Sequence, residues 1–347
     1  MAKQPKVLFF ARRFYPLIGG VEKHVFEISK RLIKKGFKVT VVTEGYQSLP
    51  HIDNIEGIKI LRISAGSDGK LKKFKIWFEL FKNINLIKSS DIIHCHDVFF
   101  WYLPFRFLFP FKKIYTTFHG YEGNNMPSKK SILMHKLAEK LSLKNICVGD
   151  YLKKWYGTKP NIVTYGAVEI PKSIKKSKSL KNILYIGRLE EEAGIIEYLK
   201  VLKILKQKKY NFNLTVLGDG SQRKKAENFA QENNLNANFK GFVKDVYNFL
   251  PGASLVFTSR YLGTLESFVF KKLVICVYNN QIKKDCFAMS PFKDFIILEK
   301  NEEKLVGEII KYYKNQKLID EKTKKAFDWV KYQTWEKMTD NYLNLWK

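Results

Sequence analysis

The sequence is poor in cysteine and in acidic residues. Its 347 residues include four cysteines, which lie far apart in apolar or ordinary contexts: Cys95, Cys147, Cys276 and Cys286. This spacing excludes a disulfide framework and indicates reduced, structural thiols in a cytoplasmic protein. Aspartate and glutamate number 33 against 62 lysines and arginines, a formal net charge of +29. Because the basic excess is spread along the chain, we expect no specific nucleic acid partner, although charge alone leaves a basic nucleic-acid-binding protein as a distant alternative.

A long uninterrupted apolar segment is also absent. The most apolar stretch, Val98–Phe111, is 14 residues long and contains Arg106 and two prolines, whereas a membrane-spanning helix needs roughly 20 apolar residues. The first residues are polar, and the apolar run that follows them is interrupted at Arg12, so we expect no signal peptide.

What the sequence has in quantity is apolar side chains. Hydrophobic residues make up 45% of the chain and aromatic residues 15%, which is enough to bury two cores and argues against disorder. A chain of 347 residues is too long for one typical core, so we expect two domains.

The stretch Asn182–Lys200 organises the second half of the chain. Ile183–Ile186 has the length and residue types of a buried strand. Gly187 permits a sharp turn, Arg188 follows at once, and Glu190–Glu192 suit the first turn of a helix. An arginine between such a strand and helix lies where open α/β sheets bind phosphorylated ligands. An ordinary surface arginine on a turn fits the same residues.

The amino-terminal residues predict another unit of this kind. Lys6–Ala11 has the pattern of a buried strand, a helix with apolar residues at helical spacing follows, and Lys38–Thr43 has the pattern of the next strand. Gly19 and Gly20 precede the helix, where they would let a phosphate approach the backbone N–H groups. A glycine pair that only makes the turn is the simpler interpretation.

Strands alternate with helices along both halves, which is typical of parallel sheets covered on both faces. Further strands are expected at Lys59–Ile63, Asp91–Cys95, Lys113–Thr117, Asn145–Val148, Asn213–Leu217, Ala237–Lys240 and Ser254–Thr258. Asn161–Ser179 loses this periodicity and is predicted to be a linker. We therefore expect an α/β protein with two Rossmann-like doubly wound domains, residues 1–170 and 171–330, that face each other across a cleft. A terminal helix over 331–347 is expected to pack on the first domain.

Two segments contain histidines that could act chemically. His94–Asp97 holds residue types that bind metals, but strand alternation directs His94 and Cys95 to opposite faces, and no further ligand cluster is evident nearby. A structural role is therefore favoured for this segment. His119 instead follows the carboxyl end of an expected strand, where binding and catalytic groups collect.

Taken in order, these segments resemble the retaining GT-B glycosyltransferases of family 4 along nearly the whole chain. The resemblance rests on YPLIGGVEKHVFEISKRLIKKGFKVTVVT, IIHCHD, TTFHG, YIGRL, VLGDG and TLES. The donor-binding residues that it implies are Gly19, Gly20, Arg188, Gly218, Gly263, Thr264, Leu265 and Glu266. Among these, the Gly20 backbone and Arg188 would contact the donor diphosphate and Glu266 the ribose. His119 would lie near the transferred sugar, which makes His119 and Arg188 the expected catalytic residues.

Two positions depart from the family pattern. Ala193 stands where a lysine is usual, and Thr258 stands where a glutamate is usual. Because a helix N-terminus contributes less than a charge-assisted hydrogen bond, another cation is needed, and Lys271 and Lys272 are nearby in sequence. The backbone N–H groups of Gly263–Glu266, at the expected start of a helix, would serve in place of the lost carboxylate.

No Asp-x-Asp pair occurs in the sequence, so we expect no metal at the site. The resemblance implies a UDP- or GDP-linked sugar as donor, a saccharide or lipid-linked acceptor, and retention of configuration with the leaving phosphate accepting the acceptor proton. His119 would then position the sugar. Biosynthesis of a cell-surface polysaccharide or glycolipid is the expected setting. The departures at Ala193 and Thr258 leave, as the alternative, a non-catalytic subunit of another transferase.

A basic helix with an aromatic face is expected over Gly69–Lys88. Its apolar side chains share one face: Leu71, Phe74, Trp77, Phe78, Phe81 and Ile84. Its lysines lie largely off that face: Lys70, Lys72, Lys73, Lys75 and Lys82. Such a helix suits an anionic membrane surface, and packing of the aromatic face on the first sheet is the alternative. Together with Val98–Phe111 and the net charge, it predicts peripheral attachment to the cytoplasmic face of a membrane.

Overall fold

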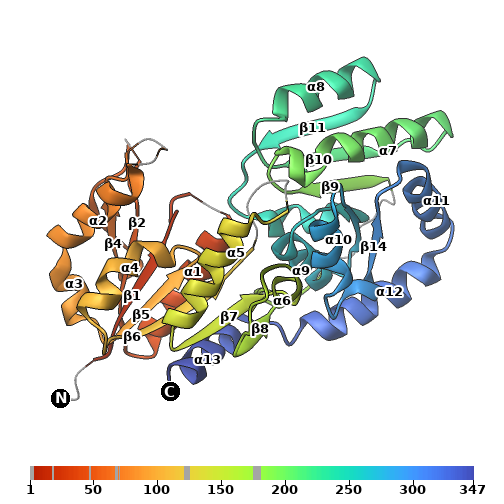
Figure 1. The fold of residues 1–347 in the computed structure, drawn as a ribbon. Coiled ribbons are helices and arrows are strands. Elements are labelled where there is room, and N and C mark those ends of the chain that lie inside the picture. The colour runs from red at the N-terminus through yellow and green to blue at the C-terminus, as the bar shows by residue number, and fades with distance from the viewer. Residues whose placement is uncertain are drawn as a thin grey trace. The chain divides into compact units, whose positions relative to one another are not determined.

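The computed structural model describes residues 4–17, 19–46, 48–66, 69, 71–120, 126–174 and 181–347 (Figure 1). The chain divides into two compact units. Among the described residues, unit 1 holds the chain up to residue 120, residues 127–165 and residues 335–347, and unit 2 holds residue 126, residues 166–174 and residues 181–334. Each unit is an α/β domain built on a largely parallel sheet, as the sequence predicted.

The sheet of unit 1 has eight strands in the order β3-β4-β2-β1-β5-β6-β7-β8. They are β1 (Lys6–Ala11), β2 (Lys38–Glu44), β3 (Ile52–Ile55), β4 (Ile58–Ile63), β5 (Ile92–His96), β6 (Lys113–Phe118), β7 (Lys144–Val148) and β8 (Ile162–Thr164). All neighbours pair in parallel except β3 with β4, which form an antiparallel hairpin at one edge. Sequence periodicity did not predict β3, because a strand of four half-exposed residues at a sheet edge carries little apolar signal.

The linker predicted over Asn161–Ser179 is wrong at its start, because Ile162–Thr164 forms β8 and pairs with β7. Residues 175–179 of that linker lie outside the described residues. The physical reason for the error is length: three residues at an edge are too few to show a strand period.

The helices of unit 1 are α1 (Gly20–Lys34), α2 (Lys72–Lys82), α3 (Ile84–Ser89), α4 (Phe99–Leu108), α5 (Lys129–Leu141), α6 (Tyr151–Tyr156) and α13 (Trp335–Trp346). The single helix expected over Gly69–Lys88 is wrong, since α2 ends at Lys82 and α3 begins at Ile84. Asn83 separates them, and its side-chain amide donates to the Glu79 carbonyl at 2.9 Å. Lys70 of the predicted helix lies outside the described residues.

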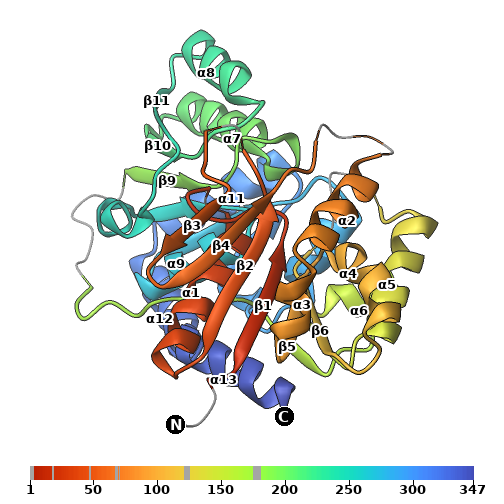
Figure 2. The ribbon, with the colours of Figure 1, turned by 90° about the vertical axis from the view of Figure 1, so that its left-hand side faces the viewer.

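The C-terminal helix α13 belongs to unit 1, although it follows the last helix of unit 2 in the chain. It lies beside α1 and also contacts β7 (Figure 2). The four residues that the sequence placed at helical spacing are all buried: Trp335, Met338, Tyr342 and Leu345. Residues 335–347 thus complete the core of unit 1.

The sheet of unit 2 has six parallel strands in the order β11-β10-β9-β12-β13-β14. They are β9 (Asn182–Ile186), β10 (Asn213–Leu217), β11 (Asn236–Gly241), β12 (Leu255–Phe257), β13 (Leu273–Val277) and β14 (Ile296–Glu299). The α-helices are α7 (Ile195–Gln207), α8 (Arg223–Glu232), α9 (Tyr261–Val269), α10 (Gln281–Ala288), α11 (Glu302–Tyr313) and α12 (Gln316–Val330).

The acidic residues after Arg188 do not form the first turn of α7, contrary to the prediction. Glu191–Ala193 forms a short 3-10 turn, and α7 begins only at Ile195. Gly194 joins the two with a φ of +77°, and a side chain there would clash with Val277. This left-handed residue explains the break, because it cannot continue a right-handed helix.

In both sheets the chain order reverses at one place. In unit 1 the chain runs from β1 outward through β2 to β4 and then returns to β5 on the other side of β1. In unit 2 it runs from β9 through β10 to β11 and then returns to β12 on the other side of β9. Ligands of open α/β sheets bind outside the carboxyl ends of the strands at such switch points. The residues that follow β1, β5, β9 and β12 are therefore the first candidates for a site.

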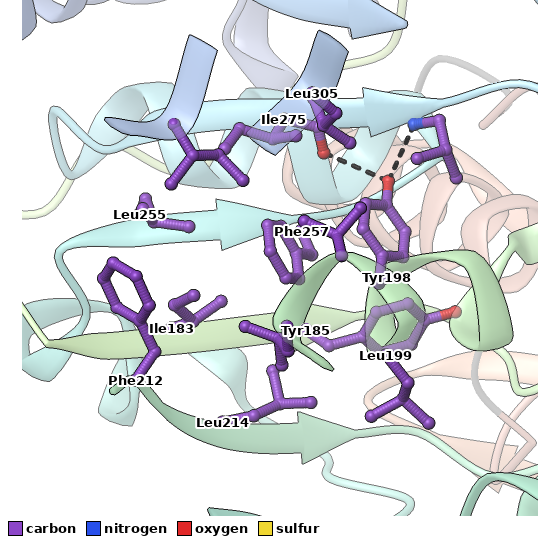
Figure 3. Close-up of a cluster of buried hydrophobic side chains, with 14 of the residues drawn as sticks. Ile183, Tyr185, Tyr198, Leu199, Phe212, Leu214, Leu255, Phe257, Ile275 and Leu305 are labelled. Carbon is purple, nitrogen blue, oxygen red and sulfur yellow. Dashed lines mark hydrogen bonds between the residues drawn. The ribbon is translucent and has the colours of Figure 1, made fainter. Parts of the chain in front are cut away.

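Tyr198 of α7 ties the carboxyl ends of two strands together in the core of unit 2 (Figure 3). Its ring stacks on Phe257 with centroids 4.5 Å apart. Its hydroxyl accepts a hydrogen bond from the Val277 backbone N–H at 3.0 Å. The hydroxyl proton is within reach of the carbonyls of Ile275, at 3.0 Å, and Thr258, at 3.1 Å. One phenol thus satisfies backbone groups that are buried away from water.

We predict that Tyr198→Phe destabilises the protein by about 1–3 kcal/mol, because the Val277 N–H would be left buried without its partner. The measurement is urea unfolding followed by circular dichroism, with Tyr332→Phe as control because Tyr332 is 61% exposed in the same unit. Equal midpoints for the two variants would contradict the role given to the Tyr198 hydroxyl.

Candidate functional site

Three histidines meet at the switch point of unit 1. His24 comes from the second turn of α1, His96 ends β5, and His119 follows β6. One ring nitrogen from each lies within 4.8 Å of the others, and His96 Nδ1 and His119 Nε2 are hydrogen-bonded at 2.9 Å. The expectation that no ligand cluster lies near His94–Asp97 is therefore wrong. The cluster was hidden because its other members come from distant parts of the chain.

A chain of hydrogen bonds fixes the proton on His94 and links this residue to His24. The Trp346 indole N–H, which can only donate, donates to His94 Nδ1 at 3.1 Å. His94 Nε2 must then carry the proton and donate it to Thr117 Oγ1 at 2.7 Å. The Thr117 and Tyr342 hydroxyls are hydrogen-bonded at 2.9 Å, and the Tyr342 hydroxyl is hydrogen-bonded to His24 Nε2 at 2.8 Å. The network thus connects His94 to His24 through two hydroxyl groups.

Burial keeps this cluster uncharged. It lowers the pKa of His24 to about 3 and lowers the pKa of His94, His96 and His119 well below the usual value. Neighbouring histidines lower the pKa of the last three further, since each would repel a second positive charge. At neutral pH His119 is thus a neutral imidazole, which can orient a hydroxyl by hydrogen bonding but carries no charge.

The backbone of His119 is held by Asp97. The His119 N–H donates to Asp97 Oδ1 at 2.8 Å, and the Asp97 N–H donates to the Thr117 carbonyl at 3.0 Å. Asp97 has a φ of +61°, the left-handed region that aspartate tolerates better than most residues. The turn after β5 and the turn after β6 therefore position each other.

His24, His96 and His119 also have ring nitrogens close enough together to be considered as ligands of one metal ion. In the described part of the chain, they form the cluster of this kind. Three imidazole nitrogens are a ligand set that zinc accepts, with nitrogens about 3.4 Å apart in a tetrahedral site. His96 Nδ1 and His119 Nε2 are closer, at 2.9 Å, which fits a hydrogen bond better. The absence of a metal from the site stays a prediction.

The predicted phosphate loop lies at the start of α1, next to His24. Gly19 is the N-cap and Gly20 the first helical residue. A side chain on Gly20 would meet no atom within 4 Å, whereas one on Gly19 would clash with the Glu22 carboxylate. Open space above Gly20 is what backbone contact with a ligand requires, although the Glu22 carboxylate in the same turn opposes an anion.

In unit 2, Arg188 follows β9 at the second switch point. Its side chain is 59% exposed and lies 3.4 Å from Glu192 Oε1. The Tyr185 hydroxyl donates to the Arg188 carbonyl at 2.9 Å, which fixes the backbone of the turn. Gly218 supports the same turn, because a side chain on it would overlap the Gly187 carbonyl. The absence of a side chain at Gly218 therefore allows the backbone to pack closely beside Arg188.

The helix that contains Glu266, the predicted ribose contact, begins earlier than the sequence predicted. Helix α9 begins at Tyr261, and the Thr264 N–H already donates to the Arg260 carbonyl at 3.0 Å. Of Gly263–Glu266, only Gly263 has its N–H in the first turn, so the expected row of free N–H groups is wrong. The Leu265 side chain is fully buried, and Glu266 is 3% exposed in α9.

The two lysines considered as substitutes for the missing one point elsewhere. Lys272 donates to the carbonyls of Pro251 and Ala253, and Lys271 lies over the Phe327 ring. Sequence reasoning missed Arg260, whose guanidinium lies 2.7 Å from Glu192 Oε1. Its position three residues after the end of β12 was the signal that could have identified it, since β12 is the other strand of the switch point.

Two family models cover most of the chain. Residues 18–161 match the model described as Glycosyltransferase Family 4, and residues 168–329 match that described as Glycosyl transferases group 1. An uncharacterized glycosyltransferase of Methanocaldococcus jannaschii is 25% identical over 266 residues, which are 66% of this chain and 67% of that protein. A human phosphatidylinositol N-acetylglucosaminyltransferase protein is 26% identical over 243 residues, 60% of this chain but only 47% of the human one.

Solved structures share the fold over nearly the full chain. The sucrose-phosphate synthase of Thermosynechococcus elongatus superposes with a TM-score of 0.77 at 15% identity and covers 99% of this chain and 98% of its own. The HepE protein of Anabaena, solved with UDP and glucose, gives a TM-score of 0.74 at 13% identity and covers 98% of this chain and 99% of its own. At these identities the likeness concerns the fold.

We predict that the protein loses stability as the pH falls below about 6.5. Histidine pKa values are lowered in the folded state, so between pH 6.5 and the lowered values the unfolded chain binds protons that the folded one does not. Each fully buried histidine then costs about 1.4 kcal/mol per pH unit. Urea midpoints at pH 7.5 and 5.5 check this, with exposed His51→Asn as control. Equal midpoints at the two pH values would show that the cluster is charged or open to water.

Proposed function

The chain belongs to the group 1 glycosyltransferases of GT-B fold, and from this premise we propose that it transfers a sugar from a UDP- or GDP-linked donor to a lipid-linked or saccharide acceptor. We further propose that configuration is retained and that no metal takes part. The observation that supports this most is the position of Arg188 at the switch point of unit 2. Open parallel sheets bind nucleotides at such points.

The donor is bound by unit 2 in this proposal. Arg188 contacts the diphosphate, where it stabilises the negative charge that develops as the sugar departs. Glu266, which is 3% exposed in α9, accepts hydrogen bonds from the ribose hydroxyls. The charge of the leaving group is thus balanced by protein cations, which is the task that a metal performs in other transferases.

The sugar is oriented by unit 1. The acceptor hydroxyl oxygen bonds to the anomeric carbon, the bond from that carbon to the phosphate oxygen breaks, and the hydroxyl proton passes to the leaving phosphate. No protein base is needed on this route. His119, neutral and held through His96 and Asp97, positions a sugar hydroxyl by hydrogen bonding.

A lipid-linked acceptor is favoured by a surface of unit 1 that we call the aromatic surface. Its exposed side chains come from α2, the residue before it, the end of α4 and the turn that follows α4: Leu71, Phe74, Phe78, Phe81, Phe107, Leu108 and Phe111. The packed face of α2 carries Ile76 and Leu80, while three phenylalanines of the aromatic face stay exposed: Phe74, Phe78 and Phe81. Lys73 and Lys82 lie over exposed phenylalanine rings.

Helices α2 and α4 hold this surface together. The Trp77 indole N–H donates to the Phe100 carbonyl at 2.9 Å, and the rings of Phe81 and Phe105 are 4.7 Å apart. Within the described part of the chain, none of the helices combines the length and apolarity that crossing a bilayer requires. We propose peripheral attachment to the cytoplasmic face of an anionic membrane. The names of the human and Schizosaccharomyces pombe relatives, phosphatidylinositol N-acetylglucosaminyltransferases, support a phospholipid-like acceptor.

We predict that one of UDP, GDP, ADP and CDP raises the melting temperature by several degrees at saturation, since 100 times the dissociation constant stabilises by about 2.7 kcal/mol. Arg188→Ala should abolish the shift. Lys200→Ala, which removes a cation paired with Glu302 on the same unit, is the control and should keep it. No shift with any nucleotide at millimolar concentration would favour a non-catalytic subunit.

We predict that the protein sediments with vesicles containing anionic phospholipid at low salt and that the double variant Phe74→Ser, Phe78→Ser does so at least tenfold more weakly. Burying one phenylalanine contributes about 1.5–3 kcal/mol. Phe242→Ser, at an exposed position of unit 2, is the control. Protein that stays in the supernatant with anionic vesicles would end the membrane proposal while leaving the transferase proposal intact.

A further inference from the structure

Three cations converge on Glu192 in unit 2. Glu192 Oε1 lies 2.7 Å from the Arg260 guanidinium and 3.4 Å from that of Arg188. The ammonium of Lys283 donates to the backbone carbonyl of the same Glu192. Positive charge therefore exceeds negative charge among these four residues, an arrangement that attracts an anion.

The two arginines reach this point from the two strands of the switch point. Arg188 follows β9 and Arg260 follows β12, which are neighbours in the sheet. Tyrosine hydroxyls hold the backbone of both turns: the Tyr185 hydroxyl donates to the Arg188 carbonyl, and the Tyr198 hydroxyl lies 3.1 Å from the Thr258 carbonyl. The convergence is thus built into the sheet topology and does not depend on a loop alone.

The arginines remain accessible while the carboxylate between them is mostly covered. The Arg188 and Arg260 side chains are 59% and 37% exposed, whereas that of Glu192 is 17% exposed. Lys283 is 3% exposed, and burial lowers its pKa to about 8. A dissolved ligand can therefore reach the two guanidinium groups. The buried Lys283 instead binds the backbone of the turn at the Glu192 carbonyl.

We propose that Arg260 is a second binding residue for the diphosphate of the donor, next to Arg188, and that Glu192 holds both side chains together until the diphosphate replaces it. This inference rests on the proposed function. A diphosphate offers several oxygens to two guanidinium forks, which bind such groups in a bidentate manner. The cation that is missing at Ala193 is then supplied from the turn after β12.

The position of Ala193 supports this assignment. Ala193 is 1% exposed, and its neighbour Glu192 is the residue whose carbonyl Lys283 binds. A cation from α10 thus already binds the backbone next to Ala193, and Arg260, with a side chain that is 37% exposed, remains accessible.

The test measures the affinity of whichever nucleoside diphosphate binds the wild-type protein, together with its monophosphate, by calorimetry. Arg260→Ala should weaken diphosphate binding by about ten- to a hundredfold, the range for losing one charge-assisted hydrogen bond, and should weaken monophosphate binding less. Arg260→Lys should fall between Arg260→Ala and the wild type, because it keeps the charge and loses the fork. Glu192→Gln should tighten diphosphate binding at least threefold, since the competing charge is gone. Lys200→Ala is the matched control on the same unit and should bind like the wild type.

Each outcome decides between the two proposals. If the wild type binds no nucleoside diphosphate, the proposed function fails. If the wild type binds, Arg188→Ala does not, and Arg260→Ala binds within about threefold of the wild type, the role of Arg260 is overturned and the proposed function stands. If Arg260→Ala unfolds, Arg260→Lys and Glu192→Gln decide: a Glu192→Gln protein that binds more weakly than the wild type shows that Glu192 supports the ligand, which overturns the exchange.

Discussion

One buried tyrosine hydroxyl in each unit holds the polar groups at the carboxyl ends of the strands. In unit 2 the Tyr198 hydroxyl accepts from the Val277 N–H and lies against the carbonyls at the ends of β12 and β13. In unit 1 the Tyr342 hydroxyl joins Thr117, at the end of β6, to His24 of α1. Because a buried group without a partner costs about as much as a lost hydrogen bond, both tyrosines fix where the turns after the strands begin. The candidate site residues lie on those turns.

The two units carry opposite kinds of electrostatics on similar sheets. At the switch point of unit 1, His24 and His96 are buried and His119 is half-buried, and lowered pKa values keep all three neutral. The arginines at the switch point of unit 2 are exposed and share the carboxylate of Glu192. A neutral imidazole network suits the orientation of sugar hydroxyls, and a cationic pair suits a diphosphate. The same fold therefore provides two chemistries through the residues that follow its strands.

Much of the fold was readable from the sequence because buried parallel strands leave a strong signal. The runs Lys6–Ala11 and Ile183–Ile186 are continuous apolar segments, and both form central strands. The strand β13, Leu273–Val277, was missed although it is a continuous apolar run. Other errors fall where that signal is weak or local geometry intervenes. β8 has three residues at an edge, Asn83 interrupts a continuous helical pattern, and Gly194 in a left-handed conformation separates the acidic residues from α7.

The sequence by itself determined the class of fold, the strand that precedes Arg188 and the place of His119 after a strand, because these depend on neighbouring residues. Only the tertiary structure decided which distant residues join them. His24 and His96 reach His119 through the packing of α1 and β5, and Arg260 reaches Arg188 because β12 pairs with β9. Lys271 and Lys272 were candidates because they follow Glu266 closely in the sequence. In the structure, Lys271 lies over the Phe327 ring and Lys272 donates to a buried carbonyl. Side-chain direction follows from the packing of whole elements, which no local pattern encodes.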